Sequence, residues 1–146
     1  CSSLLEISIP PSVKIINAFA FSQCRSLVDV EFDDDSNLTQ FSIGIFDQCS
    51  SLKEIEIPPG VNEICDNAFF ECTSLENVYL PESLEKIHNR VFAKCSSIAN
   101  IEIPPSVSFI GENSFYGCTS LMEISIPSSV DLSNSGLQSN TKVIEI

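Results

Sequence analysis

Basic side chains are scarce in this chain: 7 Lys and Arg residues stand against 20 Asp and Glu residues, and the net charge is −13. A surface of that sign repels phosphate backbones and anionic lipid head groups. Nucleic acid and anionic membranes are therefore poor candidates for a partner. A basic patch on a protein, a cation or a neutral ligand remains open.

Long hydrophobic runs are also missing. Although 43% of the residues are hydrophobic, no run approaches the ~20 apolar residues that cross a bilayer, so we expect no segment inserted in a membrane. The chain begins at Cys1 and does not show the Met, the basic stretch and the apolar stretch that open a secretory leader. It reads as an internal fragment or a processed form from which any targeting sequence has been removed. Its 146 residues suit a single domain, residues 1–146, with a buried core.

What the chain does contain is an internal repeat. Six cysteines are separated by 23, 25, 23, 23 and 23 residues, and the same text follows each of them, as in CSSLLEISIPPSV, CSSLKEIEIPPGV and CSSIANIEIPPSV. The repeats start at Cys1, Cys24, Cys49, Cys72, Cys95 and Cys118. The spacing predicts a solenoid of five full repeats, and residues 131–146 form a degenerate terminal repeat or cap.

Each repeat carries the motif L-x-x-I-x-I, in which the last two apolar positions are two residues apart and so point to one face of a strand. Prolines follow the strands and stop them, because proline has no N–H for the next ladder bond. A second apolar pair and then a phenylalanine complete the inward positions. The expected aromatic ladder is Phe21, Phe46, Phe69, Phe92 and Phe115. We predict a mainly β solenoid with little helix and slight curvature, in which Ile144 and Ile146 can form one more strand.

This pattern resembles the 23-residue BspA-like type of leucine-rich repeat, also called the Treponema pallidum type. The resemblance implies a surface-exposed or secreted protein, because several members of that family are adhesins that bind host cells or extracellular-matrix proteins. The second repeat departs from the pattern, since a two-residue insertion at Asp33–Asn37 replaces the proline turn. The last repeat departs from it too, because it lacks the Ala-Phe-x-x-Cys segment.

Acidic residues recur at the outward strand positions, where a solenoid usually meets its partners. Seven of the twelve positions in two adjoining columns are acidic, and only Lys53 in the neighbouring column opposes them. The candidate partner-binding residues of this acidic stripe are Glu6, Asp29, Glu31, Glu54, Glu56, Tyr79, Glu102 and Glu123. The alternative is a solvated face that like charge keeps soluble.

The cysteines that start the repeats suggest a disulfide framework or a zinc site, yet stacked rungs hold their Cα–Cβ vectors parallel and ~4.8 Å apart. No C-x-x-C motif supports a zinc site. We expect a buried ladder of reduced thiols. The seventh cysteine, Cys65, stands one rung from His88, but a catalytic dyad of the two lacks an orienting third group and an oxyanion hole. Adjacent surface turns explain that pair better, so we expect no catalytic residue.

Three further features are expected to lie on the surface. Asp33 to Asp35 could attract a calcium ion, but no EF-hand spacing supports it, so an acidic loop is the expectation and no metal site is predicted. Asn37 begins an N-glycosylation sequon in the same loop. Lys86, Arg90 and Lys94 form either a local basic patch or part of a solvated face.

Together these observations predict a non-catalytic module that binds a protein and needs no cofactor. The first hypothesis is an adhesion or recognition segment of a longer surface or secreted protein, with a host-cell or matrix protein as the partner. The alternative is an intracellular scaffold or adaptor in the cytoplasm.

Overall fold

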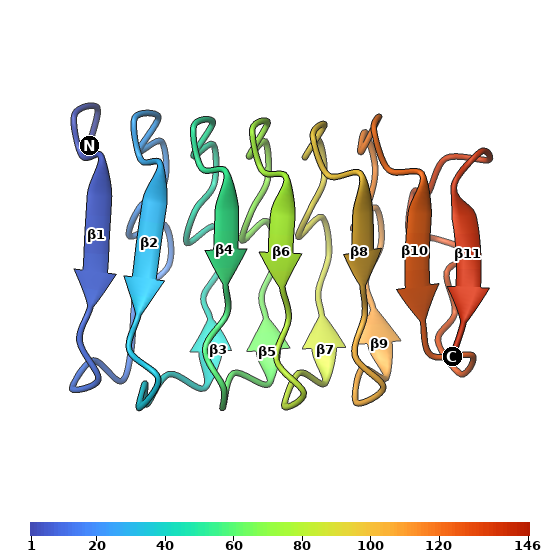
Figure 1. The fold of residues 1–146 in the computed structure, drawn as a ribbon, viewed down its shortest axis with the longest axis horizontal. Coiled ribbons are helices and arrows are strands. Elements are labelled where there is room, and N and C mark those ends of the chain that lie inside the picture. Colours follow the sequence, from blue (N-terminus) through green and yellow to red (C-terminus); the bar gives the residue numbers. More distant parts are fainter.

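The computed structural model describes residues 1–146, and its long strands lie side by side in a nearly straight row (Figure 1). The strands of this front layer, called the front sheet below, are β1 (Glu6–Ile9), β2 (Asp29–Phe32), β4 (Glu54–Glu56), β6 (Asn77–Tyr79), β8 (Asn100–Glu102), β10 (Glu123–Ile126) and β11 (Lys142–Glu145). Strand hydrogen bonds join them in three groups, β1 with β2, β4 with β6, and β8 with β10 and β11. All the paired strands are parallel, as stacked repeats require, because each repeat enters the sheet in the same direction. The mainly β solenoid with little helix expected from the sequence is confirmed, and the structure contains strands and no helix.

A second, shorter sheet lies behind the first and runs in the opposite direction (Figure 1). It contains β3 (Gln40–Phe41), β5 (Glu63–Ile64), β7 (Lys86–Ile87) and β9 (Phe109–Ile110), in that hydrogen-bonded order. Each strand supplies one buried residue and one residue that faces away from the core. The second apolar pair of each repeat therefore reaches the core through this back sheet.

Prolines begin the turns that leave the front sheet. The nitrogen of the third residue after each proline donates to the proline carbonyl, as from Val13 to Pro10 at 3.1 Å and from Leu84 to Pro81 at 3.0 Å. In the second repeat an aspartate turn takes this place, and Ser36 N donates to Asp33 O at 2.9 Å. The two inserted residues are absorbed in that turn, because the next apolar residue, Leu38, is buried like its counterparts.

The aromatic ladder runs through the core between the two sheets. Consecutive rings stack with centroids 5.5, 5.7, 5.5 and 5.8 Å apart in the order Phe21, Phe46, Phe69, Phe92 and Phe115. Phe69 and Phe92 are fully buried, whereas Phe21 in the first repeat is half-buried. The predicted ladder is confirmed, and its middle rungs are the best protected.

The C-terminal strand β11 pairs with β10 in a register that the alternation of apolar residues did not specify. Val143 lies opposite the inward residue Ile124, while Ile144 lies opposite the outward residue Ser125. Ile146 is 58% exposed. The last strand therefore extends the front sheet, and its one isoleucine, Ile144, lies on the outward side, while Ile146 lies beyond the strand.

The structure offers no helix with the length and hydropathy that a membrane crossing needs.

Candidate binding face

The acidic stripe is one continuous surface on the front sheet. In the first column Glu6 lies opposite Asp29 and Glu54 lies opposite Asn77. The second column places Glu56 opposite Tyr79, and Ser125 opposite Glu102. The side chains alternate with buried isoleucines and valines, because successive residues of a strand point to opposite faces. The strands thus bring all the predicted partner-binding residues to one face.

Almost every charged side chain of this face is without an internal partner. No side-chain hydrogen bond or ion pair involves Glu31, Glu54 or Glu56, and the same holds for Tyr79 and Glu102. The exception is Glu123, whose carboxylate lies 3.1 Å from the ammonium of Lys142 in β11. Sequence reasoning missed Lys142, although its place before an alternating Val-Ile-Glu segment could have marked it as an outward strand residue.

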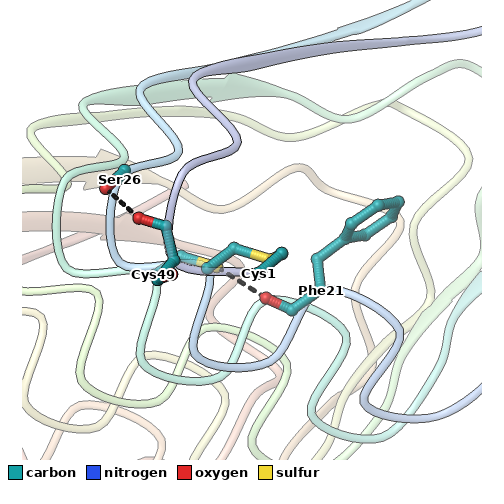
Figure 2. The surroundings of a disulfide bond; sticks show 6 residues. Cys1, Phe21, Ser26 and Cys49 are labelled. Carbon is teal, nitrogen blue, oxygen red and sulfur yellow. Dashed lines mark hydrogen bonds between the residues drawn. A yellow bond between two sulfur atoms is a disulfide. The ribbon is translucent and has the colours of Figure 1, made fainter.

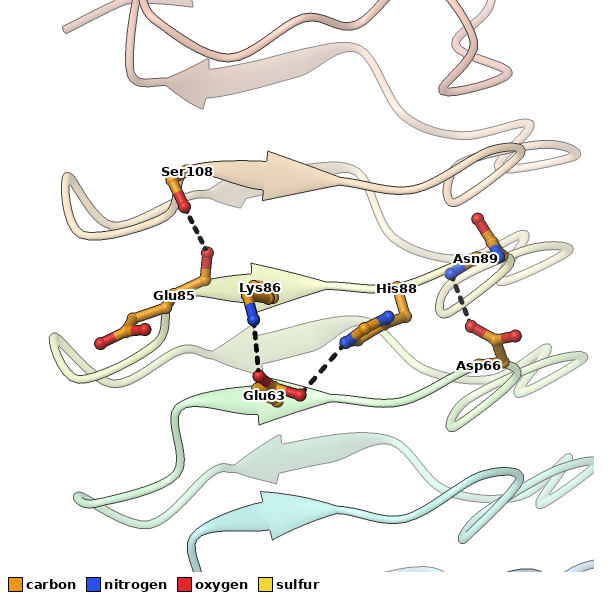
Figure 3. Close-up of polar contacts among 7 residues, drawn as sticks. All are labelled: Glu63, Asp66, Glu85, Lys86, His88, Asn89 and Ser108. Carbon is orange, nitrogen blue, oxygen red and sulfur yellow. Dashed lines mark hydrogen bonds and ion pairs between the residues drawn. The ribbon is translucent and has the colours of Figure 1, made fainter.

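In the back sheet, an acidic residue is paired with basic residues of the next rung (Figure 3). Glu63 in β5 accepts a hydrogen bond from Lys86 at 2.9 Å, and its other oxygen lies 3.3 Å from His88 Nε2. These contacts, the one from Lys86 first, lower the pKa of Glu63. Lys94 pairs in the same way with Glu71 at 2.7 Å. Two of the three basic residues near His88, Lys86 and Lys94, are thus matched with acids one rung away.

Two grooves hollow the front face, and they meet at Tyr79. The first has a volume of about 390 Å³ and is lined on its polar side by carboxylates, namely Asp29, Glu31, Asp33, Asp34, Glu54 and Glu56. The second, of about 550 Å³, is lined by Asn77, Asn100, Glu82 and Glu102 together with Pro104, Pro105 and Ile146. Tyr79 lines both grooves and is 55% exposed. The face is therefore strongly acidic in its N-terminal half and more neutral beyond Tyr79, a division that the sequence columns did not reveal.

Four of the ladder cysteines are free and buried, as expected. Each thiol donates to the carbonyl of the ladder phenylalanine of an earlier rung, at 3.1 Å, as from Cys49 to Phe21 and from Cys95 to Phe69. Burial, the largest cause, raises the pKa of Cys49 and of Cys118 to about 12. Burial also raises the pKa of Cys72 and Cys95 well above its usual value.

The expectation that the whole ladder is reduced was wrong at its first two rungs. Cys1 and Cys24 form a disulfide, with their Cα atoms 4.8 Å apart. Figure 2 shows the surroundings of this disulfide, where the carbonyl oxygen of Phe21 accepts a hydrogen bond from the thiol of Cys49. Cys1 is exposed, so its side chain is free to turn toward Cys24 in the next rung. The parallel Cα–Cβ vectors assumed for stacked rungs therefore do not hold there.

Thiol labelling tests this arrangement. At neutral pH and without reductant, an alkylating reagent should modify Cys65 first, because Cys65 is the only free cysteine that is not fully buried. Its reaction should accelerate as the pH rises, because burial and then the nearby Glu63 and Asp66 raise the pKa of its thiol. The four ladder thiols should react only as fast as the protein unfolds. Peptide mass spectrometry after digestion follows each site.

Reduction provides the control. Cys1, which is exposed, should become reactive only after a reductant is added, whereas Cys24 is buried and should then react no faster than the ladder thiols. Rapid modification of Cys72 or Cys95 in the native protein would contradict the buried ladder, and modification of Cys24 without reductant would contradict the disulfide.

The other candidate residues are not joined into a catalytic or metal site. His88 contacts Glu63 and lies edge-on to Phe109, and no hydrogen bond links its ring to Cys65. No group of three or more His, Cys, Asp or Glu side chains has an arrangement that could hold a metal ion. The side-chain amide of Asn37 is exposed and donates to Pro11 O at 2.9 Å, so attachment of a glycan there requires this bond to open. Glycosylation of Asn37 stays a prediction.

Comparison with known proteins supports the assignment of this architecture to one family. The family model of the BspA type leucine rich repeat region matches residues 1–95 and 39–146, with 6 copies. The chain belongs to the BspA-type leucine-rich repeat family. No curated protein sequence matches it.

Solved leucine-rich repeat proteins share the fold of this chain. A leucine rich repeat protein of T. pallidum is 28% identical, with a TM-score of 0.87 over 97% of this chain and 69% of that protein. One from Bacteroides ovatus is 34% identical, with a TM-score of 0.77 over 94% of this chain and 33% of that protein. A leucine rich cell surface protein from Faecalibacterium prausnitzii is 30% identical, with a TM-score of 0.63 over 83% of this chain and 38% of that protein.

Leucine-rich repeats generally mediate contacts between proteins, and the families built from them are generally non-enzymatic scaffolds. The chain spans only about a third of the length of the Bacteroides relative and 38% of the Faecalibacterium relative. The BspA-type repeats of this chain are thus comparable to one section of those proteins.

Proposed function

We propose that this chain is a recognition module of a surface or secreted protein, and that the front face binds a protein partner through a basic segment. The observation that carries the proposal is the set of unpaired carboxylates on the front sheet. Glu6 lies opposite Asp29 on neighbouring strands, and the carboxylates of the front sheet, Glu123 apart, have no partner inside the chain. Stacked like charges cost stability, and a basic partner would offset that cost.

The shape of the face supports a segment rather than a flat surface as the bound element. Tyr79 lines both grooves, so an extended chain laid across the strands would pass over its ring from one groove to the other. Lysine or arginine side chains would meet the acidic groove, and the exposed ring of Tyr79 can contact a cation over its face. Glu56 and Glu102 flank this ring in the same column. The more neutral second groove then suits the uncharged part of the segment.

One of the relatives supports the proposed setting of the module. The Faecalibacterium protein is a cell surface protein by its name, and the fold and sequence of this chain resemble part of it. In such a setting the partner class is a host-cell or extracellular-matrix protein. The acidic charge of the module favours matrix proteins with exposed basic segments over nucleic acid or anionic membranes.

A peptide library displayed on phage tests this proposal and does not require an identified partner. Selection on the wild-type chain should enrich peptides rich in Lys and Arg, and their binding should weaken as salt is raised, because exposed charges are screened beyond ~8 Å at physiological ionic strength. The double variant Glu56→Lys/Glu102→Lys should bind the selected peptides with association roughly tenfold slower or more, since surface charges mainly steer encounter. Surface plasmon resonance measures both rates.

The back of the solenoid offers a matched control. Glu85 and Glu112 are exposed, lie outside the front sheet and form no side-chain ion pair. Glu85→Lys/Glu112→Lys changes the net charge by the same amount and should bind the peptides almost as the wild type does. Equal loss of peptide binding in the two double variants would mean that net charge alone explains the effect, and it would contradict a specific site on the front face. Enrichment of peptides without basic residues would refute the proposed partner chemistry.

A further inference from the structure

A separate hollow lies away from the front face, on the ridge of turns between each ladder phenylalanine and the following cysteine. It has a volume of about 360 Å³ and is lined by Phe70, Arg90, Ala93, Lys94, Asn113 and Tyr116. None of these residues belongs to the front sheet. The hollow is therefore independent of the acidic grooves.

Stacking of three rungs builds this hollow. Glu71 N donates to Ala93 O at 3.0 Å, and Lys94 N donates to Tyr116 O at 2.6 Å, so Phe70, Ala93 and Tyr116 hold the same position in successive repeats. A small residue thus stands between two aromatic ones. Ala93 is fully buried by its neighbours, whereas Tyr116 is 57% exposed. The hollow opens above Ala93 because the two large side chains stand on either side of it.

The rung after Tyr116 packs closely on its backbone. A Cβ atom on Gly136 would lie 2.9 Å from Tyr116 Cβ and 3.0 Å from Tyr116 Cα, closer than real side chains approach. The glycine permits this close approach at the base of Tyr116, while more than half of the residue stays exposed.

The charges of the hollow set it apart from the rest of this acidic protein. Lys94 is occupied, because its ammonium lies 2.7 Å from Glu71 and 5.2 Å from the ring centre of Phe70. Arg90 is exposed, and its guanidinium forms no hydrogen bond or ion pair within the chain. The side chain of Asn113 is also without a hydrogen bond. The hollow thus offers a free guanidinium and a free carboxamide beside an exposed aromatic ring.

The backbone at Arg90 has the conformation of its counterparts in the other rungs. Its φ is +54°, and Asn67 and Asn113 at the same position have φ values of +57° and +55°. The left-handed turn therefore belongs to the repeat, and it sets the direction in which the side chains of Arg90 and Asn113 leave the ridge.

We infer that this hollow binds an acidic sugar unit. The guanidinium of Arg90 matches a carboxylate with two parallel hydrogen bonds. The ring of Tyr116 offers an apolar surface for the C–H face of a sugar, and the amide of Asn113 can both donate to and accept from its hydroxyl groups. The hollow is open to solvent on the turn ridge, which suits a hydrated unit within a polysaccharide chain better than an apolar ligand. The unpaired front-face carboxylates lie on another face, and salt screens them.

Titration with tetragalacturonate, followed by isothermal calorimetry and by chemical-shift changes of the backbone amides, tests this site. The acid should bind, and the shifts should centre on Arg90, Asn113 and Tyr116. The fully methyl-esterified tetramer keeps the rings and hydroxyl groups but lacks the charge, so its affinity should be lower by about tenfold or more. Arg90→Gln should weaken binding of the acid by a similar factor. A sulfated tetrasaccharide of the same length tells whether the site prefers carboxylates to sulfates.

Matched variants separate this site from general effects. Arg25→Gln removes the same charge from another exposed turn and should leave binding unchanged. Tyr116→Leu keeps a Cβ atom against Gly136 but removes the ring, and it should weaken both the acid and the ester. The double variant Glu56→Lys/Glu102→Lys should still bind the acid with shifts at Arg90, so that failure of the front-face proposal and failure of this one can be told apart.

Several results would overturn the inference. These are equal binding of the acid and the ester, undiminished binding by Arg90→Gln in a protein whose thermal unfolding is that of the wild type, and no binding of the acid at all. Tighter binding of the sulfated sugar than of the acid would overturn the assignment of a carboxylate.

Discussion

Phe69→Ala should lower the free energy of unfolding by about 4 kcal/mol, because deletion of a buried phenylalanine removes its transfer free energy and leaves a cavity. Phe69 is fully buried, and its ring stacks on Phe46 at 5.7 Å and on Phe92 at 5.5 Å. It lies in the third of the stacked repeats, so the cavity would interrupt the ladder near its middle. Urea denaturation followed by circular dichroism measures the loss.

The position in the array predicts more than the size of the effect. Repeats contact only their neighbours, so a weakened interface in the middle can let the two halves unfold separately. We expect the urea transition of Phe69→Ala to broaden or to split. Phe109→Ala is the control, because this side chain is 46% exposed on the back sheet and should contribute less than about 1 kcal/mol. Equal losses for the two variants would contradict the buried ladder.

Gly111→Ala should also cost about 3 kcal/mol, for a different reason. A Cβ atom at Gly111 would lie 2.6 Å from the backbone nitrogen of Asn89 and 2.6 Å from the carbonyl carbon of His88. These are backbone atoms, so neither can rotate away. The rung would have to shift, and overpacking of this kind costs stability. Gly111 is held in place because its own nitrogen donates to Ile87 O at 2.8 Å.

The matched control is the same position two rungs earlier. Cys65 occupies it with a side chain already present, so Cys65→Ala adds no atom and should change stability by less than about 1 kcal/mol. Thermal unfolding of both variants, with the wild type alongside, decides the comparison. Should Gly111→Ala unfold at the wild-type midpoint, the close approach of the two rungs at Asn89 would be wrong.

Several properties of the chain could be predicted because they depend only on the spacing of residues. The 23-residue period places Phe69 and Phe92 in one column, and their rings stack as expected. The alternation in Glu54–Glu56 puts Ile55 inward and the glutamates outward, as the strand shows. These conclusions hold because residues one period apart must occupy equivalent places in a stack of repeats.

The candidate site was predicted less completely. Its residues were placed on the correct face, but the two grooves and the role of Tyr79 as their meeting point were not foreseen. Lys142 was missed because residues 131–146 do not follow the period, so no column could be extended to them. The disulfide between Cys1 and Cys24 was missed because ideal stacking was assumed at every rung, whereas Cys1 is exposed and has the freedom to turn.

The repeat, the inward ladders and the columns of the outward face could be predicted from the order of the residues, since each of these follows from periodicity along one dimension. Which charges in a column find a partner, as Glu63 does and Glu56 does not, became known only from the folded chain. The same holds for which neighbouring columns join into a hollow, as around Arg90 and Tyr116. Such contacts run between columns and depend on side-chain rotamers and on the conformation of each turn, and a repeat period carries no information on either.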